Sequence, residues 1–396
     1  MRILGLDVSK SSVSACLLTE KPDLPRQFYY EANFWKIEAT SEGIAKLLAL
    51  NSDVAILEPT GVNYSKFWRV HLERAGVEVR QVGHKELRSY RQHHLGLPDK
   101  DDDADSLALA CYYFDYSTDP KRFVQPRDET IIRVRELVLR LAHLNRIQSP
   151  IINRLRQDLA WQFPEIALRR GYRATESETV PILWAWLANE RKSTKYDQLY
   201  AESIGLGVND SSRRHALRLC EIHREEISIE SELKKLLKDS RFIPYRQVFK
   251  IFAFGLRLEC IILSQIFPIE NFMLDGKPEV QIRKGRNSKK PTKRYLSLRR
   301  FQKALGLAPS LEQSGDTKKV RMRGGSDLCR KSLWQWVFTR IEPQRSRLKN
   351  EVGKVLSKQL DDEKTSGRPI KLVRMRVAAH AVRLLFKQLT APNLNV

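Results

Sequence analysis

The 396-residue sequence predicts an α/β domain that is followed by an all-α, strongly basic remainder. Short β-rich runs alternate with helical patterns over the first 115 residues, and from about residue 127 the pattern becomes helical. The charge changes at the same place, because residues 1–125 hold 16 Lys and Arg against 18 Asp and Glu, whereas the remainder holds 54 against 29. We therefore expect three domains, at residues 1–125, 126–241 and 242–396.

Five strand-like runs define the predicted front domain. The fourth and fifth runs alternate with helical patterns over 64–76, 84–95 and 103–115, of which the first is stopped by Gly76. Three strands in a meander, followed by a β-α-β-α succession, predict one layered α/β domain. The runs are 2–9, 12–20, 26–33, 53–60 and 77–83.

Two long helices are expected in the middle of the chain. The first begins near residue 127 with apolar residues at helical spacing, and Pro150 is expected to kink or restart it. The second covers 211–238, where Ile222, Ile229 and Leu236 recur every seven residues. This short coiled-coil pattern suits a hairpin within the chain or a contact between two chains, and an ordinary packed helix would also show it.

The stretch 283–300, RKGRNSKKPTKRYLSLRR, contains nine basic residues and no acidic one. It predicts a basic loop, or the start of a helix that lies on phosphates, with a merely solvated loop as the alternative. A turn-rich stretch then leads to helix candidates at 327–341, 346–360 and 370–389. The candidate nucleic-acid contacts here are Arg283, Lys284, Arg286, Lys289, Lys290, Lys293 and Arg294.

The overall composition limits the class of protein. A net charge of +23 indicates a polyanionic partner, most often nucleic acid. The five cysteines form no CxxC pair, so we expect reduced thiols without a zinc site or disulfide framework. The longest apolar run is interrupted by Arg257 and Glu259, so we expect no membrane span and a cytoplasmic location.

Four carboxylates are candidates for a metal site. Asp7 lies inside the first strand and Glu58 at the end of the fourth, while Asp102 and Asp105 lie three apart at the start of a helix and so share one face. Such a cluster would repel itself unless a cation lay within it, and Mg²⁺ binds carboxylates and phosphates together. The alternative is that the acidic run at 99–105 is only a solvated helix start.

These residues resemble a known family. The stretches GLDVSK, LEPTGVNY, LERAGVEVRQV and KDDDADSLALACY resemble the RuvC branch of RNase H-like nucleases. More narrowly, they resemble the DEDD transposases of the insertion-sequence-110 family, which includes Piv-type DNA invertases. The resemblance implies a RuvC-like catalytic domain at 1–125 that binds Mg²⁺ or Mn²⁺ through a tetrad. The tetrad residues would be Asp7, Glu58, Asp102 and Asp105.

The resemblance is weaker in the back half, which lacks the family's paired glycines after Ile243 and Pro244 and its Ser-Lys-x-Gly before the last helix. It still aligns Ser314, followed by Gly315, with the serine that joins covalently to DNA. A serine hydroxyl needs activation, and the carboxylate-bound metal is the natural activator. The basic residues implied around it are Lys318, Lys319, Arg321, Arg323, Arg330 and Lys331.

We therefore expect a DNA recombinase that cuts and rejoins donor and target DNA, guided by a structured bridge RNA, in the cytoplasm of a prokaryote and associated with its nucleoid. The alternatives are a Piv-like invertase without guide RNA, a RuvC-like Mg²⁺-dependent nuclease, and a non-catalytic nucleic-acid binder. Because recombination holds two duplexes, we expect a homodimer or homotetramer joined through the helices at 127–160 and 211–238.

Overall fold

The computed structural model forms two compact units, Met1–Arg127 and Asp128–Val396. It describes residues 1–60, 64–97, 99–124, 128–167, 169, 179–285, 290–314, 317–322 and 324–391. The first unit is α/β and the second is mainly helical, which confirms the predicted fold class. The finer division at residue 241 stays a prediction of the sequence.

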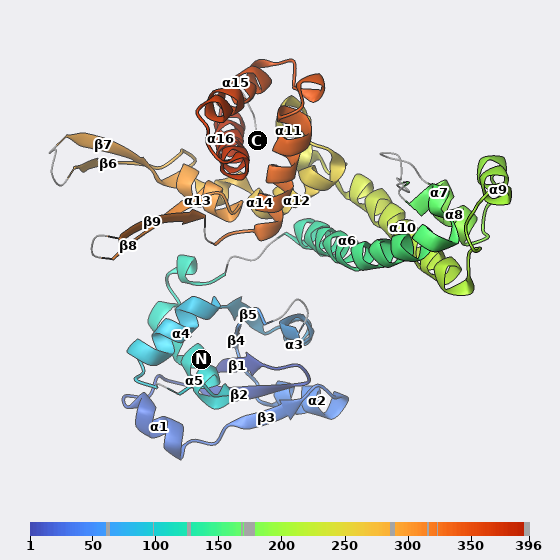
Figure 1. Ribbon diagram of the computed structural model, residues 1–396. Coiled ribbons are helices and arrows are strands. Elements are labelled where there is room, and N and C mark those ends of the chain that lie inside the picture. The colour runs from blue at the N-terminus through green and yellow to red at the C-terminus, as the bar shows by residue number, and fades with distance from the viewer. Residues whose placement is uncertain are drawn as a thin grey trace. The chain divides into compact units, whose positions relative to one another are not determined.

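The N-terminal unit is built on one five-stranded mixed sheet with the strand order β3-β2-β1-β4-β5 (Figure 1). The first three strands form an antiparallel meander, while β1, β4 and β5 run parallel to one another. The strands are β1 (Ile3–Val8), β2 (Ser12–Leu18), β3 (Trp35–Glu38), β4 (Val54–Leu57) and β5 (Glu78–Gln81). The helices are α1 (Pro25–Glu31), α2 (Ser41–Ala49), α3 (Tyr64–Arg74), α4 (His84–His93) and α5 (Asp102–Tyr116).

Helices cover both faces of this sheet, so its inner strands β1, β2 and β4 bury side chains on two sides. Along β1, Ile3 packs into a core that includes α4 and α5, whereas Leu4, Leu6 and Val8 pack into a core that includes α2 and α3. Successive side chains of a strand point to opposite faces. Asp7 therefore lies on the face of β1 that α5 covers.

The third predicted strand, 26–33, is wrong, because these residues form helix α1. Pro25 occupies the first turn, where its fixed φ favours a helix and its missing N–H costs nothing. The Tyr29 hydroxyl also donates to Asp101 at 2.7 Å, which ties this helix to the chain just before α5. The third strand of the meander instead follows at Trp35–Glu38, where it pairs with β2.

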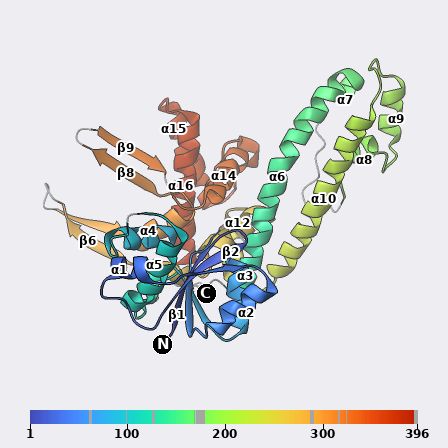
Figure 2. The ribbon, with the colours of Figure 1, turned by 90° about the horizontal axis from the view of Figure 1, so that it is seen from below.

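Two long helices of the second unit, α6 (Glu129–Gln162) and α10 (Asp210–Leu236), lie side by side and form a helical arm (Figure 2). Leu219, Ile222, Ile229 and Leu233 of α10 are buried, so the seven-residue pattern is used within the chain. Three short helices lie at the tip of the arm. They are α7 (Pro164–Ala167), α8 (Ile182–Leu187) and α9 (Thr194–Ala201).

Pro150 lies inside α6, which continues past it, so the expected restart of the helix at this position is wrong. A proline in a helix interior costs about 3 kcal/mol because it removes a hydrogen bond and clashes with the preceding turn. Leu144 before the proline and Leu155 and Leu159 after it are all buried in cores that include α10 residues. Packing on both sides thus offsets the local cost and keeps the helix continuous.

The rest of the second unit packs helices around the base of the arm and carries two β-hairpins (Figure 1). The helices are α11 (Ile243–Ile251), α12 (Leu256–Ile266), α13 (Leu296–Ala304), α14 (Asp327–Trp336), α15 (Glu351–Thr365) and α16 (Ile370–Leu389). The hairpins are β6 (Val280–Lys284) with β7 (Pro291–Tyr295), and β8 (Pro309–Ser314) with β9 (Thr317–Met322). Among the described residues, no helix is both long enough and apolar enough to cross a bilayer.

The predicted basic loop or helix at 283–300 is therefore wrong in its first part, which enters the β6–β7 hairpin. Val280, Ile282, Thr292 and Tyr295 are β-favouring residues that flank the central basic run, and the two strands pair in antiparallel register. Counting charge alone concealed this pattern, because the basic residues stand in adjacent pairs beside these residues on both strands.

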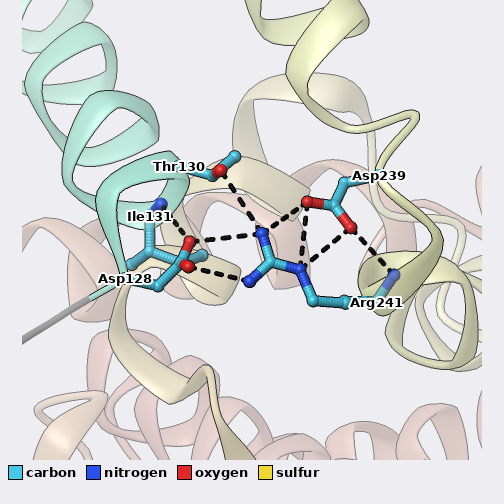
Figure 3. Close-up of polar contacts among 5 residues, drawn as sticks. All are labelled: Asp128, Thr130, Ile131, Asp239 and Arg241. Carbon is cyan, nitrogen blue, oxygen red and sulfur yellow. Dashed lines mark hydrogen bonds and ion pairs between the residues drawn. The ribbon is translucent and has the colours of Figure 1, made fainter.

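An arginine clamp fixes the start of the helical arm (Figure 3). Asp128 caps α6 by accepting a hydrogen bond from the backbone N–H of Ile131 at 3.2 Å. Arg241 donates to Asp128 at 2.7 Å and to Asp239 at 2.6 Å, so it joins the start of α6 to the turn that follows α10. Burial opposes ionisation, but the bonds from Arg241 and Ile131 outweigh it and lower the pKa of Asp128.

We predict that Asp128→Ala destabilises the second unit by about 1 kcal/mol, the usual cost of a lost helix cap. The control Asp128→Asn keeps a capping side chain and loses the charge, so it isolates the ion pair. Because the folded pKa of Asp128 lies below its usual 3.8, its contribution is present above that pH and is lost on further acidification. Urea unfolding at pH 7 and pH 3 measures both effects, and equal losses at the two pH values would contradict the assignment.

Candidate active site

Asp7 and Glu58 leave neighbouring parallel strands at the same edge of the sheet. β1 pairs in parallel with β4, and the last paired residues are Leu6 and Leu57. The next residue on each strand is Asp7 and Glu58, so the register brings these two carboxylates together. Ligands of α/β sheets gather at this carboxyl edge, where strands end and loops begin.

The other two carboxylates are brought to this edge by the close approach of α5 to β1. A Cβ atom on Gly5 would lie 2.0 Å from the carbonyl oxygen of Ser106 and 2.6 Å from the backbone nitrogen of Ala110. Only glycine therefore allows the helix axis to come this near to the strand. The first turn of α5, which carries Asp102 and Asp105, lies beyond this contact at the same end of β1 as Asp7.

The aspartates of the acidic run have different roles in the structure. Asp101 is the N-cap of α5 and accepts a hydrogen bond from the backbone N–H of Ala104 at 2.7 Å. Asp103 forms a side-chain hydrogen bond with Ser14 of β2, and burial raises its pKa. Asp102 and Asp105 are the two that interact with Asp7. The crowding of negative charge thus serves a cap and a contact with the sheet as well as the candidate site.

Electrostatics connect all four candidate residues. Burial, followed by the negative charges of Asp105, Asp102 and Glu58, raises the pKa of Asp7 from 3.8 to about 7. A hydrogen bond between Asp7 and Asp102 has the same effect, since it favours the protonated form. Four acidic side chains that repel one another at the end of two strands form a site of strong negative potential.

The chemistry of this group of donors suits a hard cation. Carboxylate oxygens are the ligands that Mg²⁺ and Mn²⁺ prefer, and a divalent ion would relieve the repulsion that raises the pKa of Asp7. Within the described part of the chain, no three His, Cys, Asp or Glu side chains already stand in a coordinating arrangement. The fit therefore rests on the composition and electrostatics of the tetrad, and its role as a metal site stays a prediction.

Two basic residues at this site were missed by sequence reasoning. His84 contacts Glu58, with 2.7 Å between its Nδ1 and the carboxylate Oε2. Arg91 is only 2% exposed and pairs with Asp105, with 2.8 Å between Nε and Oδ1. Both lie on α4 in the polar stretch HKELRSYRQHH, whose sequence gives no sign of which side chains turn inward. Burial distinguishes Arg91 from the other basic residues of α4.

The predicted nucleophile lies in the second unit. Its backbone places Ser314 at the end of β8, paired with Thr317 across the tip of the β8–β9 hairpin. The expected turn-rich stretch is thus a pair of strands that meets at the serine. Further along β9, Lys318, Lys319 and Arg321 pair with Gln313, Glu312 and Ser310 of β8. Gly315 and Arg323 lie outside the described residues.

Seven of the remaining predicted nucleic-acid contacts belong to the basic run at 283–294. Arg283, Lys284, Lys290, Lys293 and Arg294 are all exposed on or beside the β6–β7 hairpin. Arg286 and Lys289 lie outside the described residues.

Two predicted contacts on α14 have partners within the protein. Arg330 pairs with Asp327 and also donates to the carbonyl oxygen of Gly306 at 3.3 Å, so its side chain serves the local structure. Lys331 pairs with the same Asp327 at 2.7 Å but remains largely exposed. Of the two, Lys331 is the better placed to reach a phosphate.

The strand order 3-2-1-4-5, with an acidic residue near the carboxyl end of each of two central parallel strands and two more on a helix beside them, defines a RuvC-like domain of the RNase H class. Residues 4–164 match the family model for the DEDD transposase of IS110, and residues 289–352 match that for the transposase IS116/IS110/IS902 family. Together the matches cover more than half of the chain. The chain therefore belongs to the IS110 family of DEDD transposases, enzymes that cleave and rejoin DNA.

Comparison with solved structures finds, among others, RuvC from Thermus thermophilus, which is 14% identical over 31% of this chain and 100% of that chain. The TM-score is 0.24, so the fold assignment rests on the strand order and on the family matches. A comparison with curated proteins finds no match.

We predict that the metal-free protein becomes less stable as pH rises, because Asp7 must then ionise in a buried position among three other carboxylates. The folded pKa of Asp7, about 7, lies above its usual 3.8, so stability from this group is lost between these two values. Asp7→Asn should remove this dependence and unfold several degrees higher than wild type at pH 8 in EDTA, with little difference at pH 4. Mg²⁺ should raise the unfolding temperature of wild type at pH 8 more than that of the variant.

Scanning calorimetry of the full chain measures these transitions, and the variant identifies the one that belongs to the N-terminal unit. A stabilisation by Asp7→Asn that is the same at pH 4 and pH 8 would mean that Asp7 is not held among the other carboxylates.

Proposed function

We propose that this transposase cuts DNA at a divalent-metal site formed by Asp7, Glu58, Asp102 and Asp105, and rejoins it through a covalent intermediate on Ser314. The observations that carry the metal site are the parallel register that brings Asp7 and Glu58 together and the pKa of Asp7, which burial and all three of the other carboxylates raise. When bound, Mg²⁺ or Mn²⁺ would act as a Lewis acid toward the scissile phosphate.

The chain's own residues would do the rest of the chemistry. The Ser314 hydroxyl gives up its proton as its Oγ forms a bond to the scissile phosphorus, and the strand oxygen on that phosphorus leaves and takes up a proton. The phosphodiester link to serine keeps the energy of the cleaved bond. A second strand end can then attack the same phosphorus with its hydroxyl and restore the free serine without ATP.

The basic groups near Ser314 support this assignment. Lys318, Lys319 and Arg321 lie on the strand paired with that of the serine, and cations hold phosphate through charge-assisted hydrogen bonds. His84 and Arg91 would act on the tetrad, where they hold Glu58 and Asp105 in place. The Piv-like invertase shares this chemistry, whereas a RuvC-like nuclease would release the cut strands and would not need Ser314.

We also propose that the enzyme acts on chromosomal DNA in a prokaryotic cell with a structured guide RNA and as a homodimer or homotetramer. The family supports guidance by RNA, and the net charge of +23 supports binding of more than one nucleic acid. Specific RNA that copurifies with the protein would distinguish this function from that of an invertase without a guide.

We predict that Asp102→Ala or Glu58→Ala lowers the rate of strand cleavage at least about a hundredfold, because each removes a carboxylate from the proposed metal site. The matched control is Asp103→Ala, since Asp103 lies beside Asp102 on α5 but contacts Ser14. Cleavage of labelled DNA in Mg²⁺ measures the rates, and circular dichroism checks that the variants fold. Full activity in either variant, or an equal loss in the control, would exclude the assigned tetrad.

We predict that Ser314→Ala forms no covalent protein–DNA adduct and no joined product, yet binds DNA as wild type does, because only the nucleophilic oxygen is removed. The control is Ser310→Ala on the same strand, which should form the adduct normally. Labelled DNA run on a denaturing gel reveals the adduct, and mass spectrometry locates the attachment. An adduct of normal yield in Ser314→Ala, or one attached to another residue, would rule out this nucleophile.

A further inference from the structure

The β6–β7 hairpin is exposed on both of its faces. Every residue of β6 and every residue of β7 is exposed, including Ile282 at 70% and Tyr295 at 51%. A two-stranded hairpin with no packed face is at best marginally stable in water by itself. The β6–β7 hairpin therefore gains no stability from the protein core, and its exposure on both faces favours a role in binding.

The root of the hairpin is fixed firmly to α13. The carbonyl oxygen of Glu279 accepts from the N–H of Leu296 at 3.0 Å, and its own N–H donates to the hydroxyl of Ser297 at 2.8 Å. The Glu279 carboxylate pairs with Arg300 at 2.7 Å, and Arg300 also donates to the carbonyl oxygen of Phe272 at 3.3 Å. The two strands then extend away from the helices of this unit (Figure 1). The contacts of Glu279 with α13 therefore fix the direction in which the two strands extend.

The register separates the hairpin into two chemically different faces. Gln281 lies opposite Arg294, and Arg283 lies opposite Thr292. Directly opposed residues share a face and successive residues alternate, so these four side chains form one face, which we call the polar face. The other face carries two lysines and four apolar residues, among them Pro291, which pairs with Lys284. They are Val280, Ile282, Lys284, Pro291, Lys293 and Tyr295.

The polar face carries the side chains that read base edges in duplex DNA. Arginine bonds in a bidentate way to guanine and glutamine to adenine, while threonine contacts several bases. Among the described residues, neither Arg283 nor Arg294 has a carboxylate partner, so both guanidinium groups are available. Gln281 donates to Glu279 at 3.2 Å, and Thr292 donates to the carbonyl oxygen of Arg283 at 2.9 Å, so both contacts lie within the hairpin and its root.

We propose that the β6–β7 hairpin enters the major groove of duplex DNA with its polar face toward the bases, and so gives the protein a sequence preference of its own. Two strands about 4.8 Å apart, with side chains, fit a groove about 12 Å wide. Strands of five residues extend about 17 Å, which covers several base pairs. Double-stranded RNA does not offer this site, because its major groove is too deep and narrow for side chains to read.

The inference rests on the action of this chain on DNA and adds direct readout by protein to any guidance by RNA. Arg294 and Lys293 provide a matched test, because they are adjacent and both basic but lie on opposite faces. A direct reader of bases loses affinity for particular sequences when it is truncated. A contact to phosphate loses affinity evenly for all sequences.

The experiment selects sequences from a random duplex library with the purified full chain, without RNA, in EDTA and at constant salt. Wild type should enrich a short motif and bind it more tightly than unrelated duplexes. Arg294→Ala should weaken binding to that motif about tenfold and relax it at one position, with little change on other duplexes. Lys293→Ala should weaken binding evenly and leave the motif unchanged, with a shallower dependence on salt.

Absence of any enriched motif with wild type would overturn the proposal, as would equal and uniform losses for Arg294→Ala and Lys293→Ala. Competition by an RNA duplex as effective as that by DNA would also overturn it, since it would assign the hairpin to RNA. Because binding in EDTA does not require cleavage, each of these results leaves the proposed recombinase chemistry intact. Conversely, a failure of wild type to form the covalent adduct would count against the proposed function alone.

Discussion

The contact between Gly5 and the backbone of α5 is the constraint on which the candidate active site depends. Because a Cβ at this position would lie 2.0 Å from the carbonyl oxygen of Ser106, the helix can rest on the strand only through glycine. That contact sets how far the first turn of α5 stands from the end of β1. The position of Asp102 and Asp105 relative to Asp7 therefore depends on Gly5, although Gly5 has no side chain that could take part in the chemistry.

The N-terminal fold was predictable because its signals are local and agree with one another. Continuous apolar runs such as that of β4, which is buried on both faces, mark central parallel strands, and the carboxylates that interrupt or end such runs stand out against them. His84 and Arg91 could not be found in this way. Their partners lie on other elements, and nothing in a polar helix of ten residues indicates which cation becomes buried against Asp105.

Two of the errors made from sequence have a common physical cause, which is that contacts with other elements decide the local structure. The aromatic run at 26–33 favours a strand by composition, yet Pro25 and the bond from Tyr29 to Asp101 select a helix. Pro150 should interrupt α6, yet buried leucines on both sides hold the helix together. In the basic region, counting charge drew attention away from the β-favouring residues Val280, Ile282, Thr292 and Tyr295.

The helical arm joins two hydrophobic cores, because α6 and α10 contribute to one core near their base and to another at the tip with α8. A continuous helix of 34 residues is about 50 Å long, and Ile151 of α6 packs against both cores. Cooperativity in proteins is carried by contiguous packing, and separate cores open with separate free energies. Because the packing continues from tip to base through Ile151, opening of the tip is coupled to the base, and amides in the two parts of the arm should exchange together.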